Sequence, residues 1–459
     1  MKNFEFVLTK ERFQTNGGLP SVGNLLGITK LGSRINEMTV RGVKLPKISN
    51  KDVLFAYIGI LCRGNSDFCR ISEFAGDEMF CDALGIKAVA SEETLRQRLD
   101  YIAATPECLD IIEQENARLI KRSNTPVTPM HFGEGVCRIA LDIDVTPLDN
   151  DGSKREGCTR TYHGCNGFAP KMAYLGQEGY DIASQFESGS THSQKGMPEF
   201  LPRIIRNVGL AIGTGKKLLI RMDSGNDSAD NYEVMCGYPD VDFIVKRNTR
   251  REDPQHLIDY AIANGTVETP RKGKKIFRAT LLNNKEFSGR SVHQSIIVVE
   301  RTIDKNGQPL LVPVYDYSFY YTTLSERANV IDELYHDHGT SEQFHSEFKS
   351  ELDLERLPSG KFNTNALVFA LGGIAYNILR IIGQHSMKVT DNPLRKPVQR
   401  RRLRTVIRDI ITCASKQVSH ARKSLLAFAE RNRWSNTARA VNAHFQSLRI
   451  NFKSADEAV

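Results

Sequence analysis

The sequence predicts an α/β protein whose core is a mixed five-stranded sheet with helices, interrupted by a β-rich insertion and flanked by helical N- and C-terminal regions. Three observations predict this class. A helical pattern gives way to strands of alternating apolar residues, strand and helix patterns then alternate, and a second block of strand patterns precedes the final helices.

Length and composition limit the class of protein further. The chain has 459 residues, of which 40% are hydrophobic and 25% charged, with a formal net charge of +8. These values fit a globular protein of several compact regions and exclude wholesale disorder. The nine cysteines show no disulfide framework, the first residues lack the apolar stretch of a secretory signal, and no 18-residue apolar window occurs. We therefore expect a cytoplasmic protein with no membrane partner.

The N-terminal region, 1–130, reads as helical. Segments 50–64 and 91–104 carry apolar residues at three- and four-residue spacing, and Ser91 is a plausible helix start. A turn followed by a helix can dock onto DNA, which makes 1–130 a candidate DNA-binding region. A helical bundle that only packs explains the same pattern equally well.

The first part of the expected core is 131–249. Its first strand, 136–147, places Ile139, Leu141 and Ile143 on one face and Asp142 and Asp144 on the other. Two strands follow within 167–189, then a helix over 193–213 and strands over 215–223 and 241–247. The order strand–strand–strand–helix–strand–helix–strand is that of an RNase H-like core.

The remaining chain divides into three parts. Residues 250–325 contain three strand-like segments separated by turn signals, which predicts a β-rich insertion. Helical patterns resume over 326–390 as the second part of the core, where the nearly apolar run 365–382 predicts a buried helix. The C-terminal region, 391–459, is expected to be helical and is strongly basic at its start.

Three acids stand out at element ends. Asp144 ends its strand, and Asp223 ends the strand 215–223 before a turn, so neighbouring strands would bring the two carboxylates to one edge of the sheet. Glu342 lies in the helix predicted over 340–352. Taken singly, a strand-end aspartate is usually a turn former and a helical glutamate is usually solvated. Their joint placement favours a shared function.

Clustered carboxylates favour metal-dependent chemistry. Three of them would repel one another at neutral pH unless a cation compensates. Hard oxygen ligands suit Mg²⁺ or Mn²⁺, and two such ions about 4 Å apart can activate an attacking oxygen and stabilise a leaving oxygen in phosphodiester displacement.

A sequence signature surrounds Glu342. The segment YHDHGTSEQFHSEFK contains Tyr335, His338, Glu342 and Lys349 and resembles the Y-x2-R-x3-E-x6-K signature of DDE insertion-sequence transposases, with every spacing kept. ALDIDVT and LLIRMDSGND resemble the two aspartate-bearing strands of the DDE-domain group 1 transposases. ALGGIAYNILR and GSTHSQKGMPEFLPRII resemble other segments of that family.

The resemblance implies roles for these acids. Asp144, Asp223 and Glu342 would be the catalytic triad and would hold Mg²⁺ or Mn²⁺, as two ions. Asp144 is preferred to Asp142 because the family's first acid ends a strand and is often closely followed by threonine, as by Thr146 here. Asp142 is the reserve candidate.

The resemblance also implies DNA contacts. Tyr335 and Lys349 would grip phosphates near the cleaved bond. His338 stands where the family usually has arginine, and a neutral imidazole weakens that grip. Seven basic residues crowd 392–408, and they would bind phosphates; the set comprises Arg395, Lys396, Arg400, Arg401, Arg402, Arg404 and Arg408.

The function implied is that of a transposase of a bacterial insertion sequence. It would bind the terminal inverted repeats, cleave a strand and transfer it to target DNA, acting as a homodimer on double-stranded DNA near the nucleoid. Two alternatives remain at this level: a catalytically inactive DNA-binding protein derived from a transposase, and a nuclease that cuts without joining.

Overall fold

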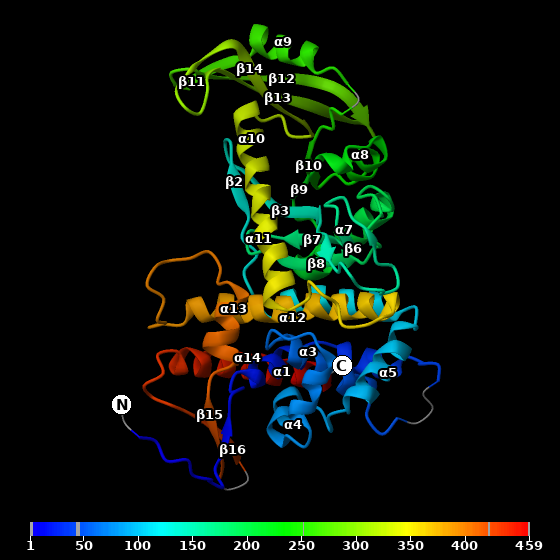
Figure 1. Cartoon of the computed structure of the whole chain (residues 1–459), viewed down its shortest axis with the longest axis vertical. Coiled ribbons are helices and arrows are strands. Elements are labelled where there is room, and N and C mark those ends of the chain that lie inside the picture. The colour runs from blue at the N-terminus through cyan, green and yellow to red at the C-terminus, as the bar shows by residue number, and fades with distance from the viewer. Residues whose placement is uncertain (1–2, 43–45, 251, 421–422, 458–459) are drawn as a thin grey trace. The chain divides into compact units, whose positions relative to one another are not determined.

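The chain forms two compact units. The computed structural model describes residues 3–42, 46–250, 252–420 and 423–457. Unit 1 combines Met1–Pro126 with Glu347–Val459, and unit 2 is Val127–Ser346. Each end of the chain therefore contributes to unit 1, and the large sheet belongs to unit 2 (Figure 1).

Five strands form the central part of unit 2, in the spatial order β8-β7-β3-β9-β10. Strand β3 runs parallel to β9, and β9 runs parallel to β10, while β7 pairs antiparallel with β3 and β8 antiparallel with β7. The bounds are β3 (Val136–Val145), β7 (Lys171–Leu175), β8 (Tyr180–Gln185), β9 (Leu218–Met222) and β10 (Val241–Lys246). These strands and the two helices between them occur in the order expected from the sequence.

Short strands attach to this sheet. Strand β2 (Met130–Phe132) pairs with the start of β3. The connection between β3 and β7 folds into a separate three-stranded sheet, ordered β4-β6-β5. Its strands are β4 (Leu148–Asp149), β5 (Thr159–Arg160) and β6 (Asn166–Phe168).

The two faces of β3 differ as the alternating pattern predicts. Ala140 packs in one hydrophobic cluster with Ile331 and Leu334 of α10 (Ala328–His336). Because side chains alternate along a strand, Leu141 and Ile143, both fully buried, point to the opposite face. The crossovers of the sheet are α7 (Met197–Ile212), which joins β8 to β9, and α8 (Ala229–Cys236), which joins β9 to β10.

The β-rich insertion is not separate from the core sheet. Strand β14 pairs antiparallel with β10, and β13, β12 and β11 follow, so the expected five-stranded sheet is part of a ten-stranded one. An unpaired β10 edge would leave backbone groups without partners, and β14 supplies them. The insertion comprises α9 (Gln255–Asn264), β11 (Thr266–Arg271), β12 (Lys274–Phe287), β13 (Arg290–Ile303) and β14 (Pro309–Thr322).

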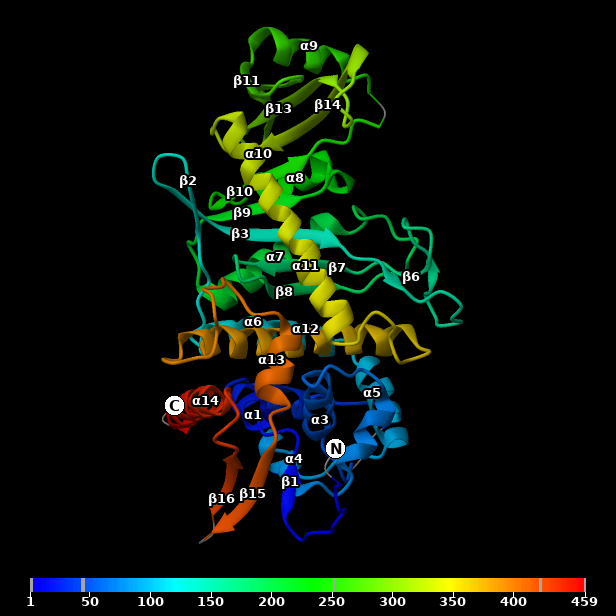
Figure 2. The ribbon, with the colours of Figure 1, turned by 60° about the vertical axis from the view of Figure 1, so that its left-hand side comes forward.

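One helical segment crosses the strands that carry the aspartates. It comprises α10, the 3₁₀ turn η3 (Asp337–Gly339) and α11 (Thr340–Ser346), and Figure 2 shows it running over β9, β3 and β7. The helix expected over 340–352 changes at Ser346 into a π-helical turn, η4 (Glu347–Glu351). A π turn holds more residues than an α turn, so Glu342 and Lys349, seven residues apart, do not lie directly above one another as they would on an unbroken α-helix.

Unit 1 is a helical assembly around one long buried helix, α12 (Phe362–Lys388), which packs on α3, α5 and α6. Among the described residues it is the single helix apolar and long enough to cross a membrane, yet 94% of its most apolar window is buried. The buried helix expected over 365–382 is thus confirmed. The N-terminal elements are α1 (Leu19–Leu26), α2 (Leu31–Glu37), α3 (Asn50–Leu61), η1 (Phe68–Phe74), α4 (Glu78–Leu84), α5 (Glu92–Ala103) and α6 (Cys108–Arg122).

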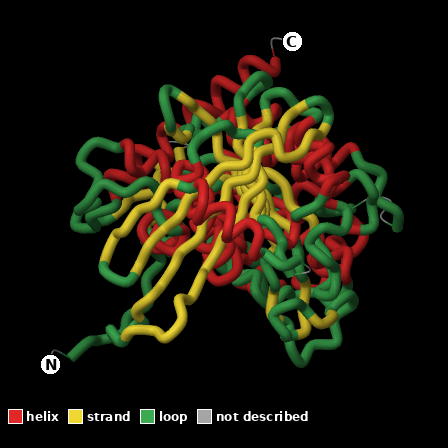
Figure 3. The backbone as a smooth tube through the Cα atoms, turned by 90° about the horizontal axis from the view of Figure 1, so that it is seen from above, coloured by secondary structure: helices red, strands yellow, loops and turns green. Residues whose placement is uncertain are grey.

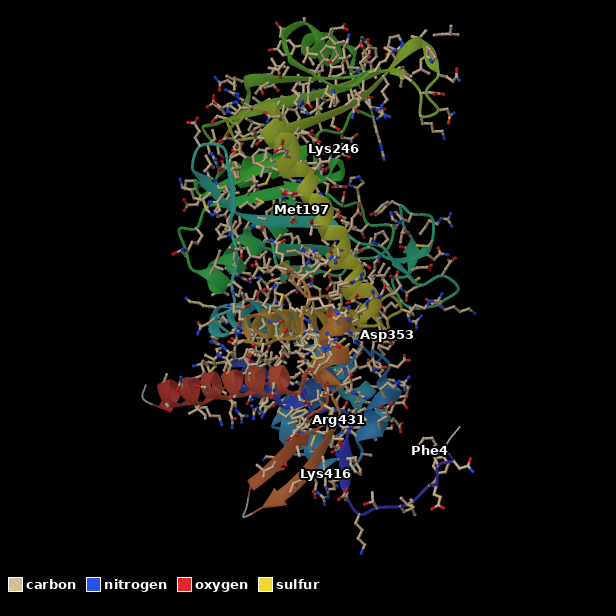
Figure 4. All side chains as sticks on the ribbon, turned by 90° about the vertical axis from the view of Figure 1, so that its left-hand side faces the viewer. Phe4, Met197, Lys246, Asp353, Lys416 and Arg431 are labelled. Atoms are coloured by element: carbon tan, nitrogen blue, oxygen red, sulfur yellow. The ribbon has the colours of Figure 1, made fainter. Side chains whose placement is uncertain are left out.

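The expectation of a purely helical C-terminal region is wrong. After α13 (Leu403–Val406) and the π turn η5 (Ile407–Ile411), strands β15 (Ser415–His420) and β16 (Lys423–Phe428) form a sheet with β1 (Arg12–Gln14), and α14 (Ser435–Glu457) follows. Figure 3 shows the N-terminal segment leading into this sheet, and Figure 4 labels Lys416, whose ammonium lies 2.6 Å from Glu11. A local pattern could not reveal these strands, because one partner comes from the other end of the chain.

Candidate active site

Two aspartates meet at the carboxyl edge of neighbouring parallel strands. The register of β3 and β9 pairs Ile143 with Met222, so the next residue of each strand, Asp144 and Asp223, follows at the same edge. The Asp144 side chain is 24% exposed, and Asp223 is also partly exposed. The two carboxylates that the sequence predicted to converge are therefore neighbours and can be reached by solvent.

Asp223 is held by the turn that follows it. Its Oδ1 accepts hydrogen bonds from the backbone N–H of Gly225 at 3.2 Å and from the side-chain amide of Asn226 at 2.9 Å. Burial, followed by the negative charge of Asp144, raises the pKa of Asp223 above its ordinary value. The hydrogen bonds thus fix the orientation of the Asp223 carboxylate, while the negative charge of Asp144 disfavours its ionisation.

Asp144 has weaker support. Its Oδ1 accepts the backbone N–H of Val145 at 2.7 Å, and its Oδ2 lies 3.4 Å from Nε2 of His345, which is too far for a good hydrogen bond. Burial alone would raise the pKa of Asp144, but His345 and then His338 outweigh it and lower that pKa. Asp144 is therefore the acid of the pair that ionises more readily.

Asp142, the reserve candidate, is fully occupied elsewhere. The guanidinium of Arg221 donates from Nε to Oδ1 at 2.7 Å and from Nη2 to Oδ2 at 2.8 Å, and His338 Nδ1 lies 2.9 Å from Oδ1. The side chain is 2% exposed. Burial opposes its ionisation, yet Arg221 and His338 together lower its pKa. Asp142 therefore has no free carboxylate face for a ligand.

His338 does not face solvent as a phosphate contact would. Its side chain is 8% exposed and directed at Asp142. Burial lowers the pKa of His338, but the hydrogen bond and charge of Asp142 outweigh that effect and raise it. The structure therefore gives His338 a role inside the protein in place of the DNA contact that the sequence suggested.

Glu342 lies near the pair but apart from it. It is exposed on α11, four residues after His338 and three before His345, which places it on the same side of the helix as both. Across the described part of the chain, no three His, Cys, Asp or Glu side chains are grouped so that they could hold one metal ion. The structure thus brings Asp144 and Asp223 together and does not group Glu342 with them.

Two tyrosines border the acids. Tyr335 packs against Tyr320 with ring centroids 4.6 Å apart and ring planes tilted by 40°, and burial followed by the charge of Asp223 raises its pKa. Tyr162, which sequence reasoning missed, donates a hydrogen bond to the carbonyl of Val145 at 3.3 Å. Burial and the charges of both aspartates raise the pKa of Tyr162 to about 12. Tyr162 lies in an irregular loop, so no periodic signal pointed to it.

Arg221 and His345 were also missed. Arg221 lies two residues before Asp223, on the same face of its strand, and the register places it beside Asp142. His345 lies seven residues after His338, two helical turns along the same side. Both spacings are visible in the sequence once the strand pairing is known.

Lys349 and the arginine run belong to unit 1. Lys349 lies 3.6 Å from Glu355. Arg401 is not exposed: it pairs with Asp409 at 2.6 Å, lies 4.0 Å above the Trp434 ring, and burial lowers its pKa to about 10. The expected DNA contact by Arg401 is therefore replaced by an internal ion pair.

The other arginines of this run remain near the surface. Arg402 pairs with Glu351 at 2.7 Å, and the side chain of Arg404 is 68% exposed. A pocket of about 560 Å³ has Trp434 in its lining together with six arginines, namely Arg395, Arg400, Arg401, Arg402, Arg408 and Arg433. This surface of unit 1 suits phosphate groups.

The aspartate pair fits a divalent cation. Its donors are carboxylate oxygens, the ligands that Mg²⁺ and Mn²⁺ prefer. Within the described residues, neither Asp144 nor Asp223 forms an ion pair with a lysine or arginine. A bound cation would relieve the repulsion that raises the pKa of Asp223.

Of the comparisons with known proteins, the one with family models agrees in kind with this chemistry. A family model described as "Transposase DDE domain group 1" matches residues 21–450. No curated protein matches the chain. Among solved structures, the cryo-EM structure of the piggyBac transposase synaptic complex with hairpin DNA matches with a TM-score of 0.42 and 12% identity, over 95% of this chain and 84% of that one.

Proposed function

The chain belongs to the transposase DDE domain group 1 family, and from this premise we propose that it cuts and rejoins DNA at the ends of a bacterial insertion sequence. The observation that carries the proposal is the pair Asp144 and Asp223, placed at adjacent strand ends with no lysine or arginine paired to either among the described residues. The order β8-β7-β3-β9-β10, with β7 antiparallel to β3, supports an RNase H-like core.

The proposed catalytic acids are Asp144, Asp223 and Glu342. Two ions of Mg²⁺ or Mn²⁺, when bound, would supply Lewis acidity and charge for phosphodiester displacement. Asp144 and Asp223 would bind the ions at the sheet edge, next to the scissile phosphate. The hydrogen bond from Asn226 would fix the orientation of the Asp223 carboxylate. Glu342, exposed on α11, would complete the set from the helix side.

The proposed DNA contacts come from both units. In unit 2, the hydroxyl of Tyr335 lies within the field of the two aspartates and would meet a phosphate near the reacting bond. In unit 1, Lys349, Arg400, Arg402 and Arg404 would bind the DNA backbone, whereas Arg401 would support Trp434 beneath them. Holding two element ends at once would require a homodimer on DNA.

Cleavage of labelled element-end DNA in Mg²⁺ tests this function. Wild type is compared with Asp223→Asn, which keeps an oxygen for the Gly225 and Asn226 hydrogen bonds but removes the charge. The matched control is Asp230→Asn, because Asp230 is an exposed acid of α8 in the same unit.

The outcomes separate the alternatives. We expect wild type and Asp230→Asn to cut and join, and Asp223→Asn to do neither. Cutting without joining by wild type would identify a nuclease, and binding without cutting would identify an inactive DNA-binding protein. Cleavage that survives Asp223→Asn would refute the assignment of the site.

A further inference from the structure

Behind the aspartate pair lies a buried network to which each acid-bearing element contributes one residue. Strand β3 supplies Asp142, two residues before Asp144. Strand β9 supplies Arg221, two residues before Asp223. The helical segment supplies His338, four residues before Glu342. Each of the three network residues thus precedes one of the three proposed catalytic acids on the same element.

Direct contacts join these members. Arg221 binds Asp142 through two parallel hydrogen bonds at 2.7 and 2.8 Å, and His338 reaches the same carboxylate at 2.9 Å. The third guanidinium contact runs from Arg221 Nη1 to the carbonyl oxygen of Leu334 in the last turn of α10, at 2.6 Å. Arg221 therefore touches all three elements, through Asp142 on β3, Leu334 on α10 and its own strand.

We propose that Asp142, Arg221 and His338 are positioning residues that set the mutual placement of Asp144, Asp223 and Glu342. The proposal rests on the proposed function for the identity of the acids. It assigns the network no contact with DNA, because the side chains of Asp142, Arg221 and His338 are only 2%, 4% and 8% exposed.

Geometry explains how the network acts at a distance. Two residues along a strand advance about 6.6 Å and return to the same face. Four residues along a helix advance about 6 Å and return close to the same side. Each acid thus lies one structural repeat beyond its network member, so a shift in the network moves the acid that follows it.

The chemistry of the network suits positioning better than stabilisation. A buried ion pair contributes little net stability compared with apolar residues of the same volume. A two-pronged guanidinium–carboxylate contact, however, fixes both distance and angle, which lysine cannot reproduce. Arg221→Lys therefore keeps the charge and removes the geometry.

The test compares Arg221→Lys with a matched pair at the other end of β3. Arg138 donates from Nε to Asp242 on β10 at 2.7 Å, and its side chain is 15% exposed. Arg138→Lys makes the same chemical change in the same strand system, away from the aspartates. In the full-length protein, Mn²⁺ affinity by calorimetry, DNA affinity and the cleavage rate constant are measured for each variant.

We expect Arg221→Lys to lower Mn²⁺ affinity and the cleavage rate by about 10- to 100-fold, the usual loss when a group that orients a metal ligand is changed. DNA affinity should stay within about twofold, because Asp142, Arg221 and His338 themselves are buried and most of the proposed DNA contacts belong to unit 1. Arg138→Lys should leave both Mn²⁺ affinity and cleavage within about twofold of wild type.

Each outcome bears on one proposal. Wild-type Mn²⁺ affinity and cleavage in a folded Arg221→Lys protein, or equal losses in Arg138→Lys, would overturn the positioning role and leave the proposed function standing. Loss of Mn²⁺ affinity in Arg221→Lys with a wild type that never cuts DNA would reject the proposed function alone.

A second pair of variants tests the same proposal in case Arg221→Lys does not fold. His338→Gln keeps a donor for Asp142, whereas His338→Leu removes it. Rescue of Mn²⁺ affinity by glutamine relative to leucine supports the network, and equal affinities in the two variants contradict it.

Discussion

Unit 1 surrounds a buried carboxylate with partners, whereas unit 2 sets two carboxylates side by side with no lysine or arginine paired to either in the described part of the chain. In unit 1, Arg380 and Glu347 have side chains that are 0% exposed and lie 2.9 Å apart. In unit 2, the charge of Asp144 raises the pKa of Asp223. Removing a carboxylate should therefore damage stability in unit 1 and chemistry in unit 2.

The largest effect expected is on chemistry, from Asp144→Asn. The amide oxygen can still accept the Val145 N–H, while the charge next to Asp223 disappears. We expect DNA cleavage to fall by at least about 100- to 1,000-fold, the loss seen when an electrostatic group leaves a reacting centre. The thermal unfolding midpoint should change little, because the lost repulsion with Asp223 and the lost attraction to His345 oppose each other. A clear drop in the midpoint would break the comparison by making Asp144 a structural acid.

The counterpart in unit 1 is Glu347→Gln. It leaves Arg380 charged and buried, a change that typically costs about 3–5 kcal/mol of unfolding free energy. Urea unfolding measures the loss. Glu355→Gln serves as the control, because Glu355 is 38% exposed and lies 3.6 Å from its ion-pair partner Lys349. This change should lower the unfolding free energy by under about 1 kcal/mol. Similar losses in the two variants would contradict the importance of burial.

The pH dependence of unit 1 gives the next effect. Burial, then the positive charges of His444 and Lys388, lowers the pKa of His385 to about 4. Because an unfolded histidine titrates near pH 6.5, the unfolded chain binds this proton first as pH falls. Stability present above about pH 6.5 is therefore lost towards pH 4, by about 3 kcal/mol in total.

Unfolding curves at pH 7 and pH 4.5 measure this loss. His385→Phe should flatten the pH dependence, since it removes the titrating ring beside Phe445. An unchanged slope in this variant would assign the acid sensitivity to other groups.

The smallest effect concerns the exposed arginines. Arg404 lies 4.0 Å from Glu351 and is 68% exposed, so Arg404→Ala should change stability by under about 0.5 kcal/mol. If Arg404 binds a phosphate, the slope of log DNA affinity against log salt concentration should become shallower by about one in Arg404→Ala. Arg401→Ala should instead reduce stability, because it removes one of the two arginines paired with Asp409 and the cation–π contact with Trp434. A loss of stability in Arg404→Ala, together with a weaker salt dependence in a fully stable Arg401→Ala, would assign the structural role to Arg404 and the phosphate contact to Arg401.

Local patterns predicted the elements better than their partners. The alternation along β3 placed Asp142 and Asp144 on one face, and the structure agrees. The pattern could not separate their roles, because those depend on Arg221 reaching across from β9. Likewise, the density of arginines at 400–404 is plain in the sequence, but the burial of Arg401 against Trp434 is not.

The sequence by itself determined the order of the five core strands and their two helices, the strand-end positions of Asp144 and Asp223, and the buried character of α12, since these follow from side-chain periodicity along one segment. The tertiary structure decided what depends on residues distant in the chain. It continued the core sheet into β14, joined β1 to β15, paired Asp142 with Arg221 and placed a histidine, His345, beside Asp144. The physical reason is that pairing and burial are properties of neighbours in space, which periodicity along a single segment does not encode.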